Sequence, residues 1–198
     1  MKRYYLFLLL ITGLSMNGFA QRMPDYGLNR VRLTDSDRTI VAEIIPVGSS
    51  PRVQLDKTYY WYNAGRIHHL QGGFSGSLLN GAYLENYPNK NLRVQGVFES
   101  GLKNGEWKEW DESGVLLRAI TWKDGTKDGK FAFYKPDGSL LESGHHKSNE
   151  LDGAITFYEG KDSLKVVHYK KGKQLPDDRR SFFKKINPFK KKTTAASK

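Results

Sequence analysis

Basic and aromatic side chains alternate near the C-terminus, and no other stretch of the sequence offers such clear interaction chemistry. Residues 179–192 read RRSFFKKINPFKKK. Basic residues attract an anionic surface and inserted aromatic rings add apolar burial, so the pattern predicts a binding segment. A solvated segment without a partner is the alternative. The candidate binding residues are Arg179, Arg180, Phe182, Phe183, Lys184, Lys185, Phe189, Lys190, Lys191 and Lys192.

Patterns typical of catalysis or metal binding are weak. The chain has no Cys, which excludes disulfides, Cys-ligated zinc and thiol chemistry. The pairs His68–His69 and His145–His146 are adjacent in expected strands, where neighbouring side chains point to opposite faces, so neither pair should share a metal ion. The sequence contains no nucleophile elbow and no phosphate loop. We therefore expect no enzyme activity, no catalytic residue, no cofactor and no metal.

The N-terminus has the pattern of a secretory signal peptide. Lys2 and Arg3 precede an apolar run from Tyr4 to Leu14, which is too short to span a bilayer comfortably. Gly18 and Ala20 are small residues suited to signal peptidase, so residues 1–20 are predicted to be removed. An uncleaved anchor is the alternative. The mature protein is expected to be exported and to be periplasmic or associated with the envelope.

A period of 24 residues governs the middle of the chain. Its markers are the dipeptides Asn80–Gly81, Asn104–Gly105, Asp128–Gly129 and Asp152–Gly153. Such dipeptides close two-residue hairpins because both turn positions need a positive φ. The four glycines are therefore predicted to be structural turn residues. A regular spacing over four units indicates a repeat array.

Large apolar residues follow the same period. Each stands two positions after the marker glycine: Tyr83, Trp107, Phe131 and Ile155. A second aromatic residue, a second turn and an apolar stretch come next in most units, so each unit should consist of strand, tight turn, strand and tight turn. The predicted fold is all-β, an elongated single-sheet β-meander with a flexible basic C-terminal tail. The repeated aromatic residues are expected to pack between units, with a sticky ligand-binding face as the alternative.

The units resemble MORN repeats, and most closely a bacterial variant of that family. The stretches NGEWKEWDESGVLLRAITWKDG and DGKFAFYKPDGSLLESGHHKSN illustrate the match, which covers about Tyr59 to Gln174. The resemblance implies an array over 57–175, with Tyr59 to Phe74 as a degenerate first unit. It constrains function little, because the family includes scaffolds, junction proteins and regulatory modules. Proteins with the bacterial variant are often labelled antitoxins.

Two further segments flank the array. Residues 21–56 should contribute one capping strand, within Arg38 to Val47, that pairs with the first repeat and covers a bare sheet edge. Residues 176–198 form the basic tail, where much of the formal net charge of +11 is concentrated.

These features together predict an exported, non-catalytic binding or scaffold module of the cell envelope. The repeat sheet would be the platform for a protein partner, and the tail would contact an anionic membrane surface. Nucleic acid is an unfavoured partner because an exported protein seldom meets it. An antitoxin-like or immunity protein that neutralises a toxin by direct binding is the alternative.

Overall fold

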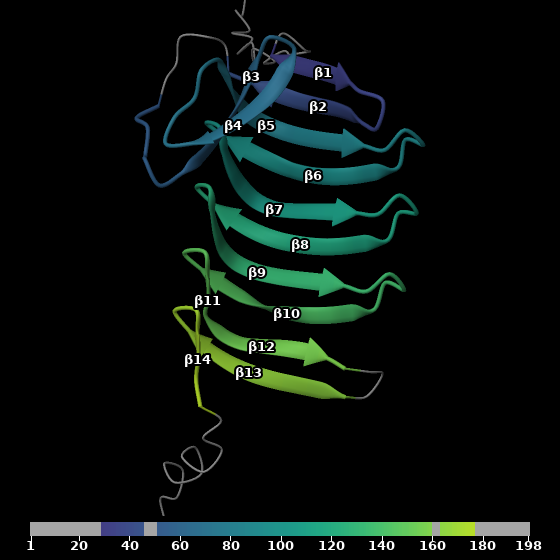
Figure 1. The fold of residues 1–198 in the computed structure, drawn as a ribbon, viewed down its shortest axis with the longest axis vertical. Helices are drawn as coiled ribbons and strands as arrows, with labels where there is room; N and C mark the ends of the chain where they lie inside the picture. The colour runs from purple at the N-terminus through teal and green to yellow at the C-terminus, as the bar shows by residue number, and fades with distance from the viewer. Residues whose placement is uncertain (1–28, 46–50, 160–162, 177–198) are drawn as a thin grey trace, which may run out of the picture.

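The computed structural model describes residues 29–45, 51–159 and 163–176. These residues form 14 β-strands and contain no helix, so none of them forms a helix that could cross a membrane. The strands make an open antiparallel sheet that is stacked along the long axis of the molecule (Figure 1). This architecture confirms the predicted all-β, elongated meander. The predicted signal peptide at 1–20 and the binding residues at 179–192 lie outside the described residues.

The sheet has one main path and one detour. Along the path the strand order is β1-β2-β5-β6-β7-β8-β9-β10-β12-β13-β14, while the hairpin β3–β4 leaves it and β11 pairs with β10. The strands are β1 (Arg30–Thr34), β2 (Thr39–Ile44), β3 (Thr58–Asn63), β4 (Arg66–Gln71), β5 (Ser77–Asn86), β6 (Leu92–Glu99), β7 (Leu102–Trp110), β8 (Leu116–Lys123), β9 (Thr126–Tyr134), β10 (Leu140–Lys147), β11 (Glu150–Leu151), β12 (Gly153–Tyr158), β13 (Leu164–Lys170) and β14 (Lys173–Gln174).

Two-residue hairpin turns recur with the period of the repeat, but the marker dipeptides do not form them. The turns are Ser100–Gly101, Asp124–Gly125 and Ser148–Asn149, and all six residues have positive φ. Positive φ at both central positions defines the turn whose twist matches antiparallel strands. The prediction that the marker dipeptides close hairpins is therefore wrong. For Asn104–Gly105, Asp128–Gly129 and Asp152–Gly153 the true turn lies four residues earlier, and Asn80–Gly81 lies within β5.

Asn104–Gly105 instead forms a bulge within β7. Gly105 has a φ of 67°, and a Cβ added there would meet nothing within 4 Å, so it is the backbone conformation that favours glycine. Pairing with β6 shifts at this point, from Val97 opposite Asn104 to Gln95 opposite Lys108. Bulges bend a strand and increase its twist, which accounts for the strong curvature of the strands in Figure 1. The remaining marker glycines also have positive φ: Gly81, Gly129 and Gly153.

The turns at the opposite end of the hairpins are held by their own side chains. Asp111 accepts hydrogen bonds from the Val115 N–H at 2.9 Å and from the Ser113 hydroxyl at 2.6 Å. Asp137 is bonded in the same way by the N–H and the hydroxyl of Ser139. These bonds lower the pKa of both carboxyl groups. The two aspartates therefore stabilise the turns in which they lie.

The core is a cross-strand ladder on one face of the sheet, here named the aromatic face. Two glycines interrupt a row of large side chains that face one another across neighbouring strands: Tyr83, Gly96, Trp107, Ile120, Phe131, Gly144 and Ile155. A Cβ on Gly96 would lie 2.3 Å from the Trp107 ring, so the ring occupies the space that a side chain would need. Trp107, Phe131 and Ile155 are buried, which confirms that these aromatic and aliphatic positions pack between units.

The N-terminal region differs from the sequence prediction in two ways. Residues 30–44 form a hairpin of two strands, β1 and β2, in place of one capping strand. In addition, β2 pairs with β5 and not with the segment after Tyr59. The reason is burial of apolar side chains, because Ile40 and Ala42 of β2 pack into the core that contains Leu79 of β5.

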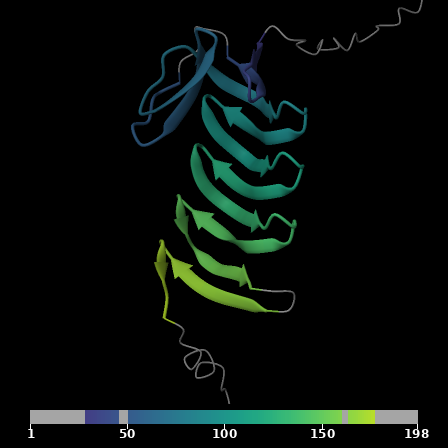
Figure 2. The same ribbon diagram turned by 45° about the vertical axis from the view of Figure 1, so that its right-hand side comes forward.

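The degenerate first unit therefore does not extend the array. Its strands form the hairpin β3–β4, which stands off the N-terminal end of the sheet (Figure 2). The hairpin is aromatic on both of its faces: Tyr60 and Tyr62 pack against the core that contains Phe98 and Trp107, whereas Tyr59 and Trp61 pack with Leu78 and Leu102. Burial of both hairpin faces requires it to fold against the sheet.

We expect Gly96→Ala to destabilise the protein by about 1–3 kcal/mol, because the new methyl group must displace the Trp107 ring. Gly73→Ala is the matched control, since a Cβ at Gly73 meets nothing within 4 Å and its φ is not positive. Thermal unfolding of both variants measures the effect. Equal melting temperatures for the two variants would contradict the ladder packing.

Candidate functional site

A groove of about 530 Å³ lies between the β3–β4 hairpin and the aromatic face. The hairpin contributes Tyr60, Ile67 and His69 to its wall. The sheet contributes aromatic and charged side chains from β5, β6 and β7, and aliphatic side chains from β2 and β8. Arg38, just before β2, adds a further charged group. The groove exists because the hairpin leaves the array and covers the N-terminal part of this face. A volume of this size suits a small ligand or a few residues of a peptide.

One wall of the groove contains a buried carboxylate with three donors. Glu85 is 6% exposed and accepts a hydrogen bond of 2.9 Å from the Tyr83 hydroxyl. Its other carboxylate oxygen lies 3.3 Å from Nη1 of Arg93 and 3.5 Å from Nη1 of Arg38. A buried charge must be paired in this way to avoid a large desolvation penalty.

Tyr83 stays a neutral donor in this network. Burial, together with the charge of the Glu85 carboxylate, raises the pKa of the Tyr83 phenol far above its usual value. The Asp37 carboxylate lies on the outer side of the two arginines, 3.6 Å from Arg93 and 3.9 Å from Arg38. The network therefore fixes β2, β5 and β6 relative to one another at the end of the groove.

A cation lies deeper in the groove among aromatic rings. The Lys103 Nζ is 4.2 Å from the ring centre of Trp107, 5.2 Å from that of Trp122 and 5.6 Å from that of Tyr60. None of the ion pairs formed by the described residues includes Lys103. Burial lowers the pKa of its amino group, and the charge of Glu109 only partly opposes this. Cation–π contacts thus replace a carboxylate partner.

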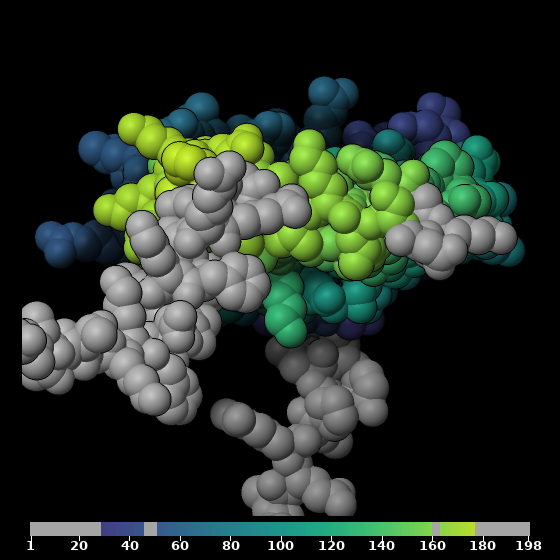
Figure 3. Space-filling view, turned by 90° about the horizontal axis from the view of Figure 1, so that it is seen from below, coloured from purple at the N-terminus to yellow at the C-terminus, as the bar shows by residue number. Residues whose placement is uncertain are grey.

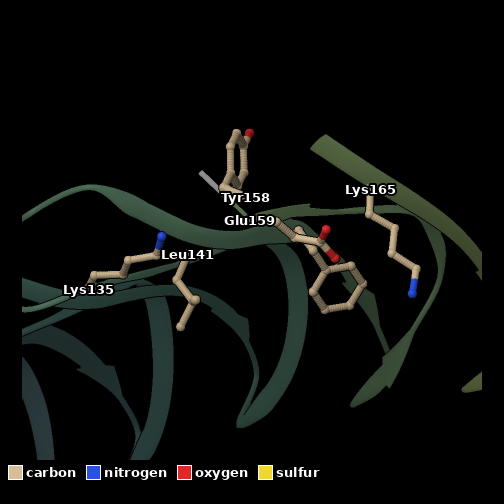
Figure 4. Close-up of a pocket in the computed structure, with 6 residues that line it drawn as sticks. Lys135, Leu141, Tyr158, Glu159 and Lys165 are labelled. Atoms are coloured by element: carbon tan, nitrogen blue, oxygen red, sulfur yellow. The ribbon is translucent and has the colours of Figure 1, made fainter. Parts of the chain in front are cut away.

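A second hollow, of about 480 Å³, lies near the C-terminal end of the sheet. Leu141, Phe157, Tyr158, Lys135 and Lys165 contribute to it together with Glu159 (Figure 4). Its side chains do not converge, because Tyr158 and Leu141 point to opposite sides of the strands. The C-terminal end of the sheet, seen from below in Figure 3, is formed by β13 and the short β14. Leu164 and Val166 of β13 are exposed there. The first groove has more converging polar groups and is the stronger candidate.

The two histidines of each adjacent pair point to opposite faces of their strand, as the alternation of side chains along a strand requires. His68 stacks on Trp61 and His69 stacks on Tyr60, so the two rings lie on opposite faces of the hairpin. His146 is buried against Phe131 at 4.5 Å between ring centres, whereas His145 is exposed. Across the described ranges, no three potential metal-binding side chains of His, Asp or Glu gather in one place.

Sequence reasoning missed Glu85 and Lys103 as site residues. The signal was present in the period: Lys103 and Lys127 occupy the position held by the apolar Leu79 and Leu151 in other units. Similarly, Glu85 and Glu109 stand where Phe133 and Phe157 stand two units later. A charged residue at a repeat position that is apolar in other units indicates where a site lies. The net charge of the whole chain gives no such location.

Comparison with known proteins adds no identification. No family model matches the chain, and no curated protein matches it.

We expect Glu85→Gln to reduce the free energy of unfolding by about 1–3 kcal/mol, because the two arginines lose the charge of their shared acceptor. Glu106→Gln is the control, since Glu106 pairs only with Lys108 and its side chain is 55% exposed. Urea denaturation of both variants provides the comparison. If Glu85→Gln lowers the free energy of unfolding no more than Glu106→Gln does, the charged network around Glu85 does not stabilise the fold.

His146 should make stability dependent on pH. Burial, and then the charges of Lys127 and His145, lower the pKa of His146 below its usual value of 6.5. The unfolded chain then binds more protons than the folded chain just below pH 6.5, so stability is full above that pH and falls on acidification. Urea midpoints at pH 7 and pH 5 should differ less for His146→Gln than for the unmodified protein. His168→Gln is the control and should retain the full difference, because His168 is exposed and is not among the groups that shift the pKa of His146.

Proposed function

We propose that the chain is an exported, non-catalytic binding module of the cell envelope. Its repeat sheet is the platform, and the groove between the β3–β4 hairpin and the aromatic face holds part of a protein partner. The observation that carries this proposal is the groove itself, where converging charged groups and aromatic rings occur on an otherwise single-layered array. The spacing of glycines and aromatic residues, which resembles that of MORN repeats, supports a role as an interaction platform.

The state of the charged groups favours binding over catalysis. Both carboxylate oxygens of Glu85 are engaged, one by the Tyr83 hydroxyl and the other by two guanidinium groups. A general base needs an oxygen that is free to accept a proton from the substrate. The aromatic rings supply the area and rigidity typical of residues that dominate binding energy at protein interfaces.

The remaining parts of the chain complete the proposal. The signal peptide at 1–20 would deliver the protein to the envelope. The tail, with its basic and aromatic residues from Arg179 to Lys192, would contact an anionic surface and hold the module near the membrane. Both stay predictions from the sequence.

The test is capture of a partner from the envelope fraction, followed by affinity measurement with the purified partner. Leu117 lines the groove, so Leu117→Arg should fill it and weaken binding at least tenfold. Val97→Arg is the matched control, because Val97 is 48% exposed and does not line the groove. Removal of residues 176–198 shows whether the tail contributes separately. A partner that binds Leu117→Arg as tightly as the unmodified protein would refute the groove as the binding site.

A further inference from the structure

Lys103 and, one unit later, Lys127 occupy a repeat position that the units before and after them fill with a leucine. The residue 24 positions earlier is Leu79, which is fully buried, and the residue 48 positions later is Leu151, which packs into the C-terminal core. A lysine at such a position costs stability, because its charge is partly removed from water. Departures of this kind from local packing rules are expected at functional sites.

The surroundings of Lys103 hold its ammonium group in a defined place. The Trp107 indole N–H donates to the carbonyl oxygens of Val97 and Asn104, both at 3.2 Å, and these bonds fix the ring whose face Lys103 contacts. Trp122 and Tyr60 approach the same Nζ from two other elements, β8 and β3. The cation is therefore preorganised before any ligand arrives, which reduces the entropy lost on binding.

The nearby carboxylates are already committed to other partners. Glu85 is shared by Arg38, Arg93 and the Tyr83 hydroxyl, and Glu109 is paired with Arg118. The ammonium N–H groups of Lys103 thus face aromatic rings and the groove. A single positive charge in this position is complementary to a single negative charge on a ligand, and a charge-assisted hydrogen bond would form between them.

We propose that Lys103 is the specificity-determining residue of the groove and binds a carboxylate of a partner peptide, next to an apolar or aromatic side chain that packs on the groove rings. This inference rests on the proposed function, because it assumes that a protein partner enters the groove. A carboxylate fits better than a doubly charged phosphate group, since one negative charge matches the single ammonium group of Lys103, whereas the arginines that line the groove are already paired with Glu85. The volume of about 530 Å³ accommodates a few residues.

The test compares ligands that differ only in charge. N-acetyl-phenylalanine has a free α-carboxylate, and N-acetyl-phenylalanine amide is its neutral counterpart. N-acetyl-Glu-Phe-amide presents a side-chain carboxylate, and N-acetyl-Gln-Phe-amide is its neutral counterpart. NMR titration of the full chain gives the dissociation constants. We expect at least one acid to bind about tenfold or more tightly than its own neutral counterpart. The tighter of the two acids then distinguishes a partner C-terminus from an internal acidic residue.

Variants assign the preference to Lys103. Lys103→Met keeps an apolar stem over the Trp107 ring and should abolish the preference for acid over amide, whereas Lys103→Arg should retain it. Lys108→Met is the control, because Lys108 points to the other side of the sheet and pairs with Glu106. Melting curves establish that each variant is folded.

The outcomes separate this inference from the function on which it rests. Equal binding of acid and amide, no saturable binding of either acid, or an acid preference that survives in Lys103→Met would each overturn the role of Lys103. The proposed function is tested separately. It fails if a purified partner binds Leu117→Arg as tightly as it binds the unmodified protein. A partner lost in Leu117→Arg and unaffected in Lys103→Met would support groove binding without a carboxylate contact.

Discussion

The close approach of the Trp107 ring to the backbone of Gly96 is the contact on which the rest of the N-terminal half depends. The ring fills the space that a Cβ at Gly96 would need, and it lies within 4.8 Å of Phe98 and 5.6 Å of Tyr83 between ring centres. Phe98 in turn contacts Tyr60 at 5.0 Å between ring centres, and this contact joins the β3–β4 hairpin to the sheet together with the backbone pairing of β3 and β5. One glycine in the ladder thus positions the ring, the hairpin and the groove between them. A single-layered sheet has few other ways to build a concave, partly desolvated site.

Two glutamates line the groove beside the hairpin at repeat positions where later units have aromatic residues. Position by position, the first two units have Glu85 and Glu109 where later units have Phe133 and Phe157. The later units bury their apolar residues in a separate core of Ile120, Phe131 and Ile155, which Trp122 links to the first core. The array therefore has a C-terminal half with an apolar core and an N-terminal half in which charged side chains are packed among aromatic rings. Such a division is what a binding platform requires, because stability and recognition are then supplied by different units.

The period of 24 residues was enough to predict the fold, but it could not locate the turns or the site. Asn–Gly and Asp–Gly suit both a two-residue turn and a bulge with positive φ, and Asn104–Gly105 takes the second form. Each bulge resets the alternation of faces, so counting residues in twos could not assign Lys103 to the aromatic face. The hairpin from Thr58 to Gln71 has the composition of a repeat unit, and only the pairing of β2 with β5 excludes it from the array. That pairing joins segments far apart in the chain, which no local pattern reveals.

The central claim is that the β3–β4 hairpin folds over the aromatic face and creates the groove. Nuclear Overhauser effects between the aromatic protons of Tyr60 and Phe98 test this most directly, because the two rings come from β3 and β6 and lie 5.0 Å apart between their centres. The fold described above predicts strong cross-peaks between these two rings. Cross-peaks from Tyr60 only to residues of its own hairpin would contradict the claim and remove the groove.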